Sequence, residues 1–109
     1  MEGLLKSREF ERLNAKTGIE LLWLYVLSSL RKKEMHAYAL RKEMEKNFPF
    51  RIGNVTTYVV LYKLESRGFV ESKKEGNRVV YKMTNKGKKL FELAKTFMKG
   101  RYSRIFGKK

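Results

Sequence analysis

The chain has 109 residues, enough for one small domain, and 42% of them are hydrophobic. Its 26 Lys and Arg against 11 Asp and Glu give a net charge of +15, which favours a polyanionic partner such as nucleic acid. The lack of cysteine excludes disulfides, zinc fingers and thiol nucleophiles, and a single histidine, His36, makes a Ser-His-Asp triad implausible. We therefore expect no enzyme, no catalytic residue, no metal site and no cofactor.

The positive charge is concentrated in the last third of the chain. Residues 1–71 carry 13 basic and 9 acidic side chains, a net of +4, whereas residues 72–109 carry 13 and 2, a net of +11. The longest apolar run, Leu21 to Leu27, is far shorter than the roughly 20 residues of a membrane span, and no signal peptide is visible. These features predict a soluble cytoplasmic protein without a membrane partner.

Three helices are expected before the middle of the chain. The first covers about residues 2–14 and has a thin apolar stripe, and the second covers about 18–31, with apolar groups on nearly all sides. The third covers about 36–48 and ends at Pro49, before a short extended connector over residues 50–53. Its expected inward residues are Tyr38, Leu40, Met44 and Phe48. His36, at its start, is interpreted as a cap rather than a pH sensor.

A fourth helix is expected over residues 54–67, capped by Asn54 and stopped by Gly68. Thr57, Tyr58, Leu61 and Leu64 have the spacing of a core-facing stripe. The opposite face is predicted to carry Thr56, Val59, Val60, Lys63 and Arg67. Exposed valines suit contact with thymine methyl groups in a major groove, and the Tyr58 hydroxyl suits contact with a phosphate.

Two strands, at about 69–74 and 78–83, are expected to form a hairpin around Glu75-Gly76-Asn77, since Gly-Asn provides the positive φ of tight turns. Lys73, Lys74 and Arg78 gather near its tip. A helix, a glycine stop and a cationic hairpin follow one another in a winged helix-turn-helix. The predicted fold is thus mainly α, with a two- or three-stranded antiparallel wing.

The last expected helix, about 85–106, is capped by Thr84 and has two apolar stripes. One domain could cover one stripe, so the second predicts dimerisation; a frayed tail or a membrane-surface helix are the alternatives. The predicted dimerisation residues are Leu90, Phe91, Ala94, Phe97, Met98, Tyr102 and Ile105. We expect a single domain, 1–109, made of an N-terminal helix (1–16), the winged helix (18–83) and a dimerisation helix with a basic tail (84–109).

Three segments resemble the PadR family of transcriptional regulators. Residues 35–40, Met-His-Ala-Tyr-Ala-Leu, are similar to the family's Met-His-Gly-Tyr-Glu-Leu. The run from Thr56 to Val70 resembles Gly-Thr-Leu-Tyr…Leu…Leu-Glu…Gly-Leu-Val, and residues 81–87 match Tyr-x-Leu-Thr-x-x-Gly. The resemblance covers about residues 22–95. Ala37 and Val55 replace the usual glycines, Ala39 a frequent glutamate and Val59 a common proline.

The resemblance implies a homodimeric repressor that binds pseudo-palindromic double-stranded promoter DNA. Combined with the exposed positions above, it gives these candidate DNA-binding residues: Asn54, Thr56, Thr57, Tyr58, Val60, Lys63, Lys73, Lys74, Asn77 and Arg78. Interface cavities that bind planar drugs or phenolics in some members leave a small-molecule effector open, with Trp23 or Phe97 as lining candidates. Two alternatives stay open: a winged-helix protein–protein module using Val59, Val60 and Tyr62, and a non-specific nucleic-acid coating protein.

Overall fold

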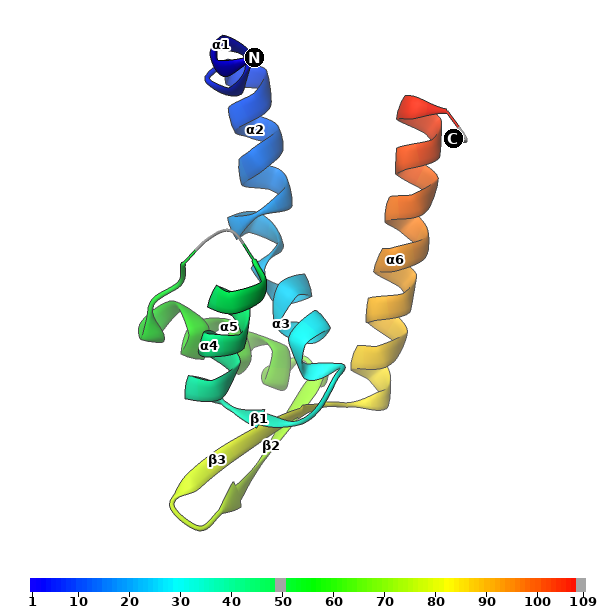
Figure 1. Cartoon of the computed structure of the whole chain (residues 1–109). Coiled ribbons are helices and arrows are strands. Elements are labelled where there is room, and N and C mark those ends of the chain that lie inside the picture. The colour runs from blue at the N-terminus through cyan, green and yellow to red at the C-terminus, as the bar shows by residue number, and fades with distance from the viewer. Residues whose placement is uncertain (49–50, 108–109) are drawn as a thin grey trace.

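A computed structural model describes residues 1–48 and 51–107 of the chain. The elements follow one another as α1 (Glu2–Leu5), α2 (Arg8–Thr17), the 3-10 turn η1 (Ile19–Leu21), α3 (Leu22–Leu30), β1 (Met35–His36), α4 (Ala37–Asn47), α5 (Asn54–Ser66), β2 (Val70–Glu75), β3 (Arg78–Met83) and α6 (Asn85–Phe106). Helices α3, α4 and α5 form a body above a three-stranded sheet (Figure 1). Helices α2 and α6 project from this body on the side away from the β2–β3 hairpin (Figure 1).

The core forms where α3 meets the other helices and the sheet. Val26 and Leu27 of α3 are completely buried, and Leu40 of α4 and Leu61 of α5 join them. The sheet contributes Val70 at the start of β2 and, at the end of β3, Met83. Burial of each of these side chains stabilises the fold by about 1.5–3 kcal/mol, because it removes apolar surface from water. These contacts therefore hold the helices in one arrangement.

The sheet is antiparallel in the order β1-β3-β2. Glu75 pairs with Arg78 at the tip, where Gly76 turns the chain with a φ of +64°. At the other edge, the two-residue strand β1 places Met35 opposite Tyr81. The predicted hairpin is confirmed, and β1 makes it the three-stranded form of the wing. We call the β2–β3 hairpin the wing from here on.

The junction between the wing and α6 explains the Thr-x-x-Gly motif. The Thr84 Oγ1 accepts a hydrogen bond from the Gly87 N–H (3.0 Å) and donates one to the Gly68 carbonyl oxygen (2.6 Å). Gly87 approaches the residue before β2 so closely that a Cβ there would lie 2.1 Å from the Phe69 carbonyl oxygen. Gly68 itself has a φ of +83°, which a residue with a side chain rarely adopts. Thr84 is therefore confirmed as the cap of α6.

Several predicted helix boundaries were wrong. The first helix is interrupted at Ser7, whose Oγ accepts from the Phe10 N–H and starts a separate α2 that continues to Thr17. The second begins with a 3-10 turn, and α5 is preceded by Gly53 as its N-cap, so Asn54 is the first helical residue and makes no capping bond. The predicted stop at Pro49 and the first residue of the connector, Phe50, lie outside the described residues, whereas residues 51–53 belong to no helix or strand, as expected.

The inward residues of α4 were only partly predicted. Leu40 and Met44 are buried and Phe48 is half-buried, but the Tyr38 ring is exposed, where Arg41 and Lys42 lie over its faces. Tyr38 precedes the buried Leu40 by two positions, which puts it on the other side of the helix. Its ring is thus available at the surface next to the wing.

Candidate nucleic-acid interface

The buried face of α5 consists of Thr57, Leu61 and Leu64. Thr57 is only 1% exposed, and its Oγ1 donates a hydrogen bond to the Gly53 carbonyl oxygen at 2.9 Å. This bond gives the buried hydroxyl a hydrogen-bond partner within the first turn of the helix. The assignment of Thr57 as a DNA contact is therefore corrected: it is a core residue, and Tyr58, expected in the core stripe, is 54% exposed instead.

Tyr58 lies on the flank of α5 that faces the wing. It borders a groove of about 440 Å³ together with the start of α4 and the wing tip. Lining the groove are His36, Ala37, Tyr38, Tyr58, Asn77, Arg78, Val79 and Tyr81. The structure thus brings the predicted residues Tyr58, Asn77 and Arg78 together at one place.

The opposite flank of α5 faces α3 and α6. Thr56, Val60 and Lys63 border a second groove, of about 550 Å³, with Trp23 and Leu90 on its other side. Thr56 and Lys63 are exposed, whereas Val60 is half-buried and packs against the core. This flank is turned away from the wing, so the expectation that Val60 lies on the outer surface was wrong.

The outer face of α5, opposite the buried face, consists of Val55, Val59, Tyr62 and Ser66. Val55 is 77% exposed, Val59 is 44% exposed and Tyr62 is 72% exposed. Val55, Val59 and Tyr62 were missing from the candidate DNA-binding residues; Val59 was expected on this face, but Val55 and Tyr62 were not. Counting helical positions from Thr57 and Leu61, rather than from Tyr58, would have placed both on this face.

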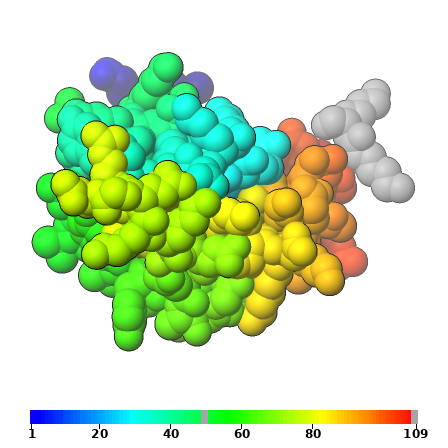
Figure 2. All heavy atoms as spheres, turned by 90° about the horizontal axis from the view of Figure 1, so that it is seen from below, coloured from blue at the N-terminus to red at the C-terminus, as the bar shows by residue number. Residues whose placement is uncertain are grey.

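The wing tip presents its cations to solvent. Lys73, Lys74, Asn77 and Arg78 are all exposed, and the Lys73 Nζ lies 3.3 Å from a Glu75 carboxylate oxygen. Seen from below, the wing, α5 and the segment that leads into α4 lie on the same face of the molecule (Figure 2). Exposed ion pairs contribute at most about 1 kcal/mol, so Lys73 keeps most of its capacity to contact a phosphate.

His36 connects this wing tip to α4. Its Nδ1 accepts a hydrogen bond from the Ala39 N–H at 3.3 Å, which confirms its capping role. Its Nε2 lies 3.2 Å from an Arg78 guanidinium nitrogen. A guanidinium can only donate, so this contact needs Nε2 as the acceptor, whereas the cap needs Nδ1. A neutral imidazole has one acceptor nitrogen and therefore makes one of these two bonds at a time. Arg78 thus lies beside the start of α4, where its guanidinium can donate to a phosphate oxygen.

A short hydrogen bond fixes the wing against α5. The Glu65 Oε2 accepts from the Ser72 Oγ at 2.6 Å, and β3 places Tyr81 beside them. Burial, followed by the nearby Glu65 carboxylate and the Tyr58 phenol, raises the pKa of Tyr81 above its usual 10. Tyr81 therefore stays neutral, and the angle between α5 and the wing is held by packing and hydrogen bonds.

The Transcriptional regulator PadR-like family model matches residues 26–93, which span the winged-helix body. The chain belongs to the PadR-like family of transcriptional regulators. No curated protein sequence matches this PadR-like chain significantly.

Solved structures with the same fold include other PadR proteins. A PadR family transcription regulator from Clostridium difficile is 26% identical, with a TM-score of 0.67, covering 78% of this chain and 97% of the other. A PadR family regulator from Eggerthella lenta is 23% identical with a TM-score of 0.71, covering 91% and 94%. A winged-helix DNA-binding protein from STIV is 23% identical with a TM-score of 0.67, covering 72% and 88%. The winged-helix fold is thereby confirmed.

The projecting helices of the PadR-like chain expose a large apolar surface. On α6, the predicted dimerisation residues Phe97, Met98, Tyr102 and Ile105 are exposed, whereas Leu90, Phe91 and Ala94 are half-buried, the first two against the body. Helix α2 has no buried residue and exposes Phe10 and Leu13. Also exposed on α6, but absent from the predicted set, are Leu93 and Phe106.

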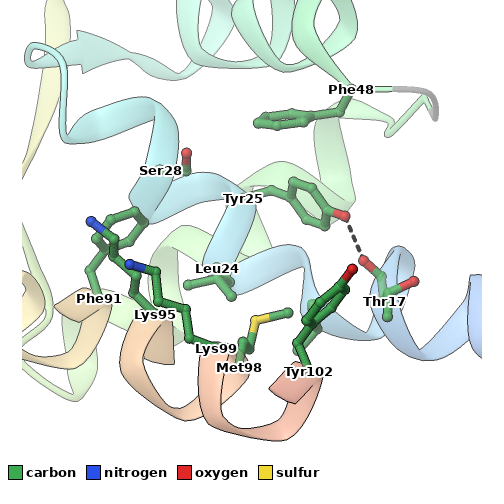
Figure 3. A pocket seen from close by; sticks show the side chains of 11 residues that line it. Thr17, Leu24, Tyr25, Ser28, Phe48, Phe91, Lys95, Met98, Lys99 and Tyr102 are labelled. Carbon is green, nitrogen blue, oxygen red and sulfur yellow. Dashed lines mark hydrogen bonds between the residues drawn. The ribbon is translucent and has the colours of Figure 1, made fainter. Parts of the chain in front are cut away.

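A pocket of about 560 Å³ lies between α3 and α6 (Figure 3). Aromatic and aliphatic side chains line it, with Tyr25 and Leu24 from α3 facing Met98 and Tyr102 from α6 (Figure 3). The Tyr25 hydroxyl donates to the Thr17 carbonyl oxygen at the end of α2. Neither Trp23 nor Phe97 lines this pocket; Trp23 lies at the groove beside α5 instead.

Among the described residues, no three His, Asp or Glu side chains lie close enough together to bind a metal ion. The helices of the same residues are all too short or too polar to cross a bilayer.

Proposed function

We propose that the chain is a sequence-specific transcriptional repressor that binds a pseudo-palindromic promoter site as a homodimer in the cytoplasm. The observation that carries this proposal is the shared face of α5 and the cationic wing (Figure 2). In winged helix-turn-helix proteins such a helix enters a major groove while flanking elements hold the backbone. The whole of residues 1–109 acts as one unit in this proposal.

The proposed contacts divide by chemistry. Lys73, Lys74 and Arg78, with His36, hold phosphates beside the groove, since charge-assisted bonds to phosphate fix position without reading sequence. Asn54 and Tyr58, near the start of α5, contact base edges or the adjacent phosphate. Thr56 and Lys63, on the flank away from the wing, contact the backbone across the groove.

The homodimer is supported by the exposed residues of α2 and α6. Helix α6 carries seven Lys or Arg against the single Glu92, so two α6 helices packed directly together would repel. Helix α2 is much less basic, with Glu9 and Glu11 against three Lys or Arg, a net of +1 compared with +6 for α6, and it exposes Phe10 and Leu13. We propose that α2 of each protomer packs on α6 of the other, which separates the two basic helices.

Salt dependence of DNA affinity tests the proposed role of the wing. Arg78→Ala should weaken binding and make the log–log salt slope less negative by about 0.9 for each phosphate that the protein no longer neutralises, or about 1.8 for a dimer with two wings. Lys6→Ala is the control, because Lys6 lies between α1 and α2, and Figure 1 shows α1 at the end of the molecule away from the wing. An unchanged salt slope in Arg78→Ala would contradict the proposed contact between the wing and phosphate groups.

A protein–protein module remains the second candidate, supported by the exposed Val59 and Tyr62. A stoichiometric protein partner, together with equal affinity for a selected duplex and for random DNA, would favour it over the repressor. The same competition separates the repressor from a non-specific coating protein.

A further inference from the structure

The first two turns of α5 lack the side chains that most often read guanine. Arg and Lys make that contact through O6 and N7 of the base, and residues 54–62 contain neither. The first cation on the helix is Lys63, on the flank that faces Trp23. A guanine beneath the start of this helix would therefore find no bidentate partner there.

The outer face of the same turns is apolar. Val55 and Val59 are one helical turn apart and both exposed, and Tyr62 continues the strip. Valine is branched at Cβ and has a restricted χ1, so its methyl groups are held in place without a large loss of entropy on binding. Such a strip matches an apolar group on the partner better than a hydrogen-bonding edge.

An A·T base pair presents the complementary groups in the major groove. Thymine projects its C5 methyl group, and adenine offers N6 and N7, which an asparagine amide can contact with two hydrogen bonds. Asn54 is exposed at the start of α5, next to Val55. Neighbouring residues on one helix face lie about 5–6 Å apart, which spans one to two base pairs at about 3.4 Å each.

On the basis of the proposed function, we infer that Val55 and Val59 read thymine methyl groups and that each half-site has A·T pairs beneath the start of α5. These two valines are the specificity-determining residues of the interface. Asn54 adds the adenine contact, and the wing and Lys63 supply affinity that does not depend on sequence. The half-site is thus identified by methyl groups rather than by guanine edges.

Replacement of thymine by deoxyuridine tests this inference, because it removes only the C5 methyl group. A duplex is first selected from a random pool with the full chain, and thymines are then replaced one position at a time. Loss of a methyl group that contacts valine should weaken binding about fourfold, corresponding to about 0.8 kcal/mol per buried carbon. Replacements outside the half-sites should have no effect.

Two variants connect the effect to the valines. With Val59→Ala, a duplex with deoxyuridine at the position that Val59 contacts should bind within about twofold of its thymine parent. In this variant the thymine methyl group no longer has a valine side chain to pack against. With Lys63→Ala, both duplexes should weaken equally and the methyl effect should persist. Tight binding of a selected site with no sensitivity to deoxyuridine, or with guanines beneath α5, would overturn the inference while leaving the repressor intact. Failure to select any sequence would instead overturn the proposed function.

Discussion

At the scale of single residues, the position of α6 depends on Thr84 and Gly87, the two fixed residues of the Thr-x-x-Gly motif. The Thr84 hydroxyl bonds both to the Gly87 N–H and to the Gly68 carbonyl oxygen, and so joins the helix stop of α5 to the start of α6. The Lys86 Nζ adds a bond to the Arg67 carbonyl oxygen at 2.8 Å. These bonds satisfy carbonyl groups at the end of α5 that would otherwise lack partners.

We expect Gly87→Ala to destabilise the fold by about 2 kcal/mol or more, since a methyl group at this position overlaps backbone and an overpacked site typically costs about 1–3 kcal/mol. The new Cβ would lie 2.1 Å from the Phe69 oxygen and 2.8 Å from the Met83 Cγ. Gly100→Ala is the matched control in the same helix, where nothing lies within 4 Å. Gly100→Ala should raise the free energy of unfolding by about 1 kcal/mol, because alanine favours a helix interior more than glycine does. Equal unfolding midpoints for the two variants in urea would contradict this account of the junction.

The residue scale also shows what the sequence could not provide. Thr57 and Tyr58 are adjacent, and both fit a stripe with Leu61 and Leu64 at helical spacing. Thr57 is buried with its hydroxyl bonded to the Gly53 oxygen, and Tyr58 borders the groove beside the wing. The spacing within residues 54–67 allows either residue in the stripe, and only contacts outside the helix show that Thr57 belongs to the core and Tyr58 to the side of the wing.

At the scale of elements, the order of parts was predictable and the boundaries were less so. Gly68, Gly76 and Thr84 each mark a change of direction through φ or a capping bond, and all three were identified from sequence. The break between α1 and α2 at Ser7 was missed, because the charged residues around it hid a local N-cap. Short polar caps inside helical patterns are therefore the weakest point of such predictions.

The exposed stripe on α6 leads to a prediction about assembly. Phe97→Glu should dissociate the proposed dimer, since a buried Phe contributes about 1.5–3 kcal/mol. With one Phe97 in each protomer, the dimer should weaken by about 4 kcal/mol, or roughly a thousandfold. Thr96→Glu makes the same charge change at an exposed neighbour that lies off the stripe. Sedimentation velocity over a concentration series should separate them. A Phe97→Glu protein that dimerises like the Thr96→Glu protein would exclude this face as the interface.

At the scale of the whole molecule, the chain separates two tasks. The body with α5 and the wing faces one direction, and the apolar surfaces of α2 and α6 project in the other (Figure 1). The pocket between α3 and α6 lies between these two regions (Figure 3). The uneven charge predicted a basic wing and a basic α6, but it did not reveal that α2 and α6 would extend freely from the body.

Methyl NMR of the valine, leucine and methionine side chains, with a selected duplex added, tests the central claim that the outer face of α5 and the wing meet DNA together. Val55 and Val59 on α5 and Val79 on the wing should shift on binding, because all three are exposed on that face. Val26 is completely buried and should not move. Shifts confined to Leu24 and Met98 at the α3–α6 pocket, with Val55 and Val59 unchanged, would contradict the account.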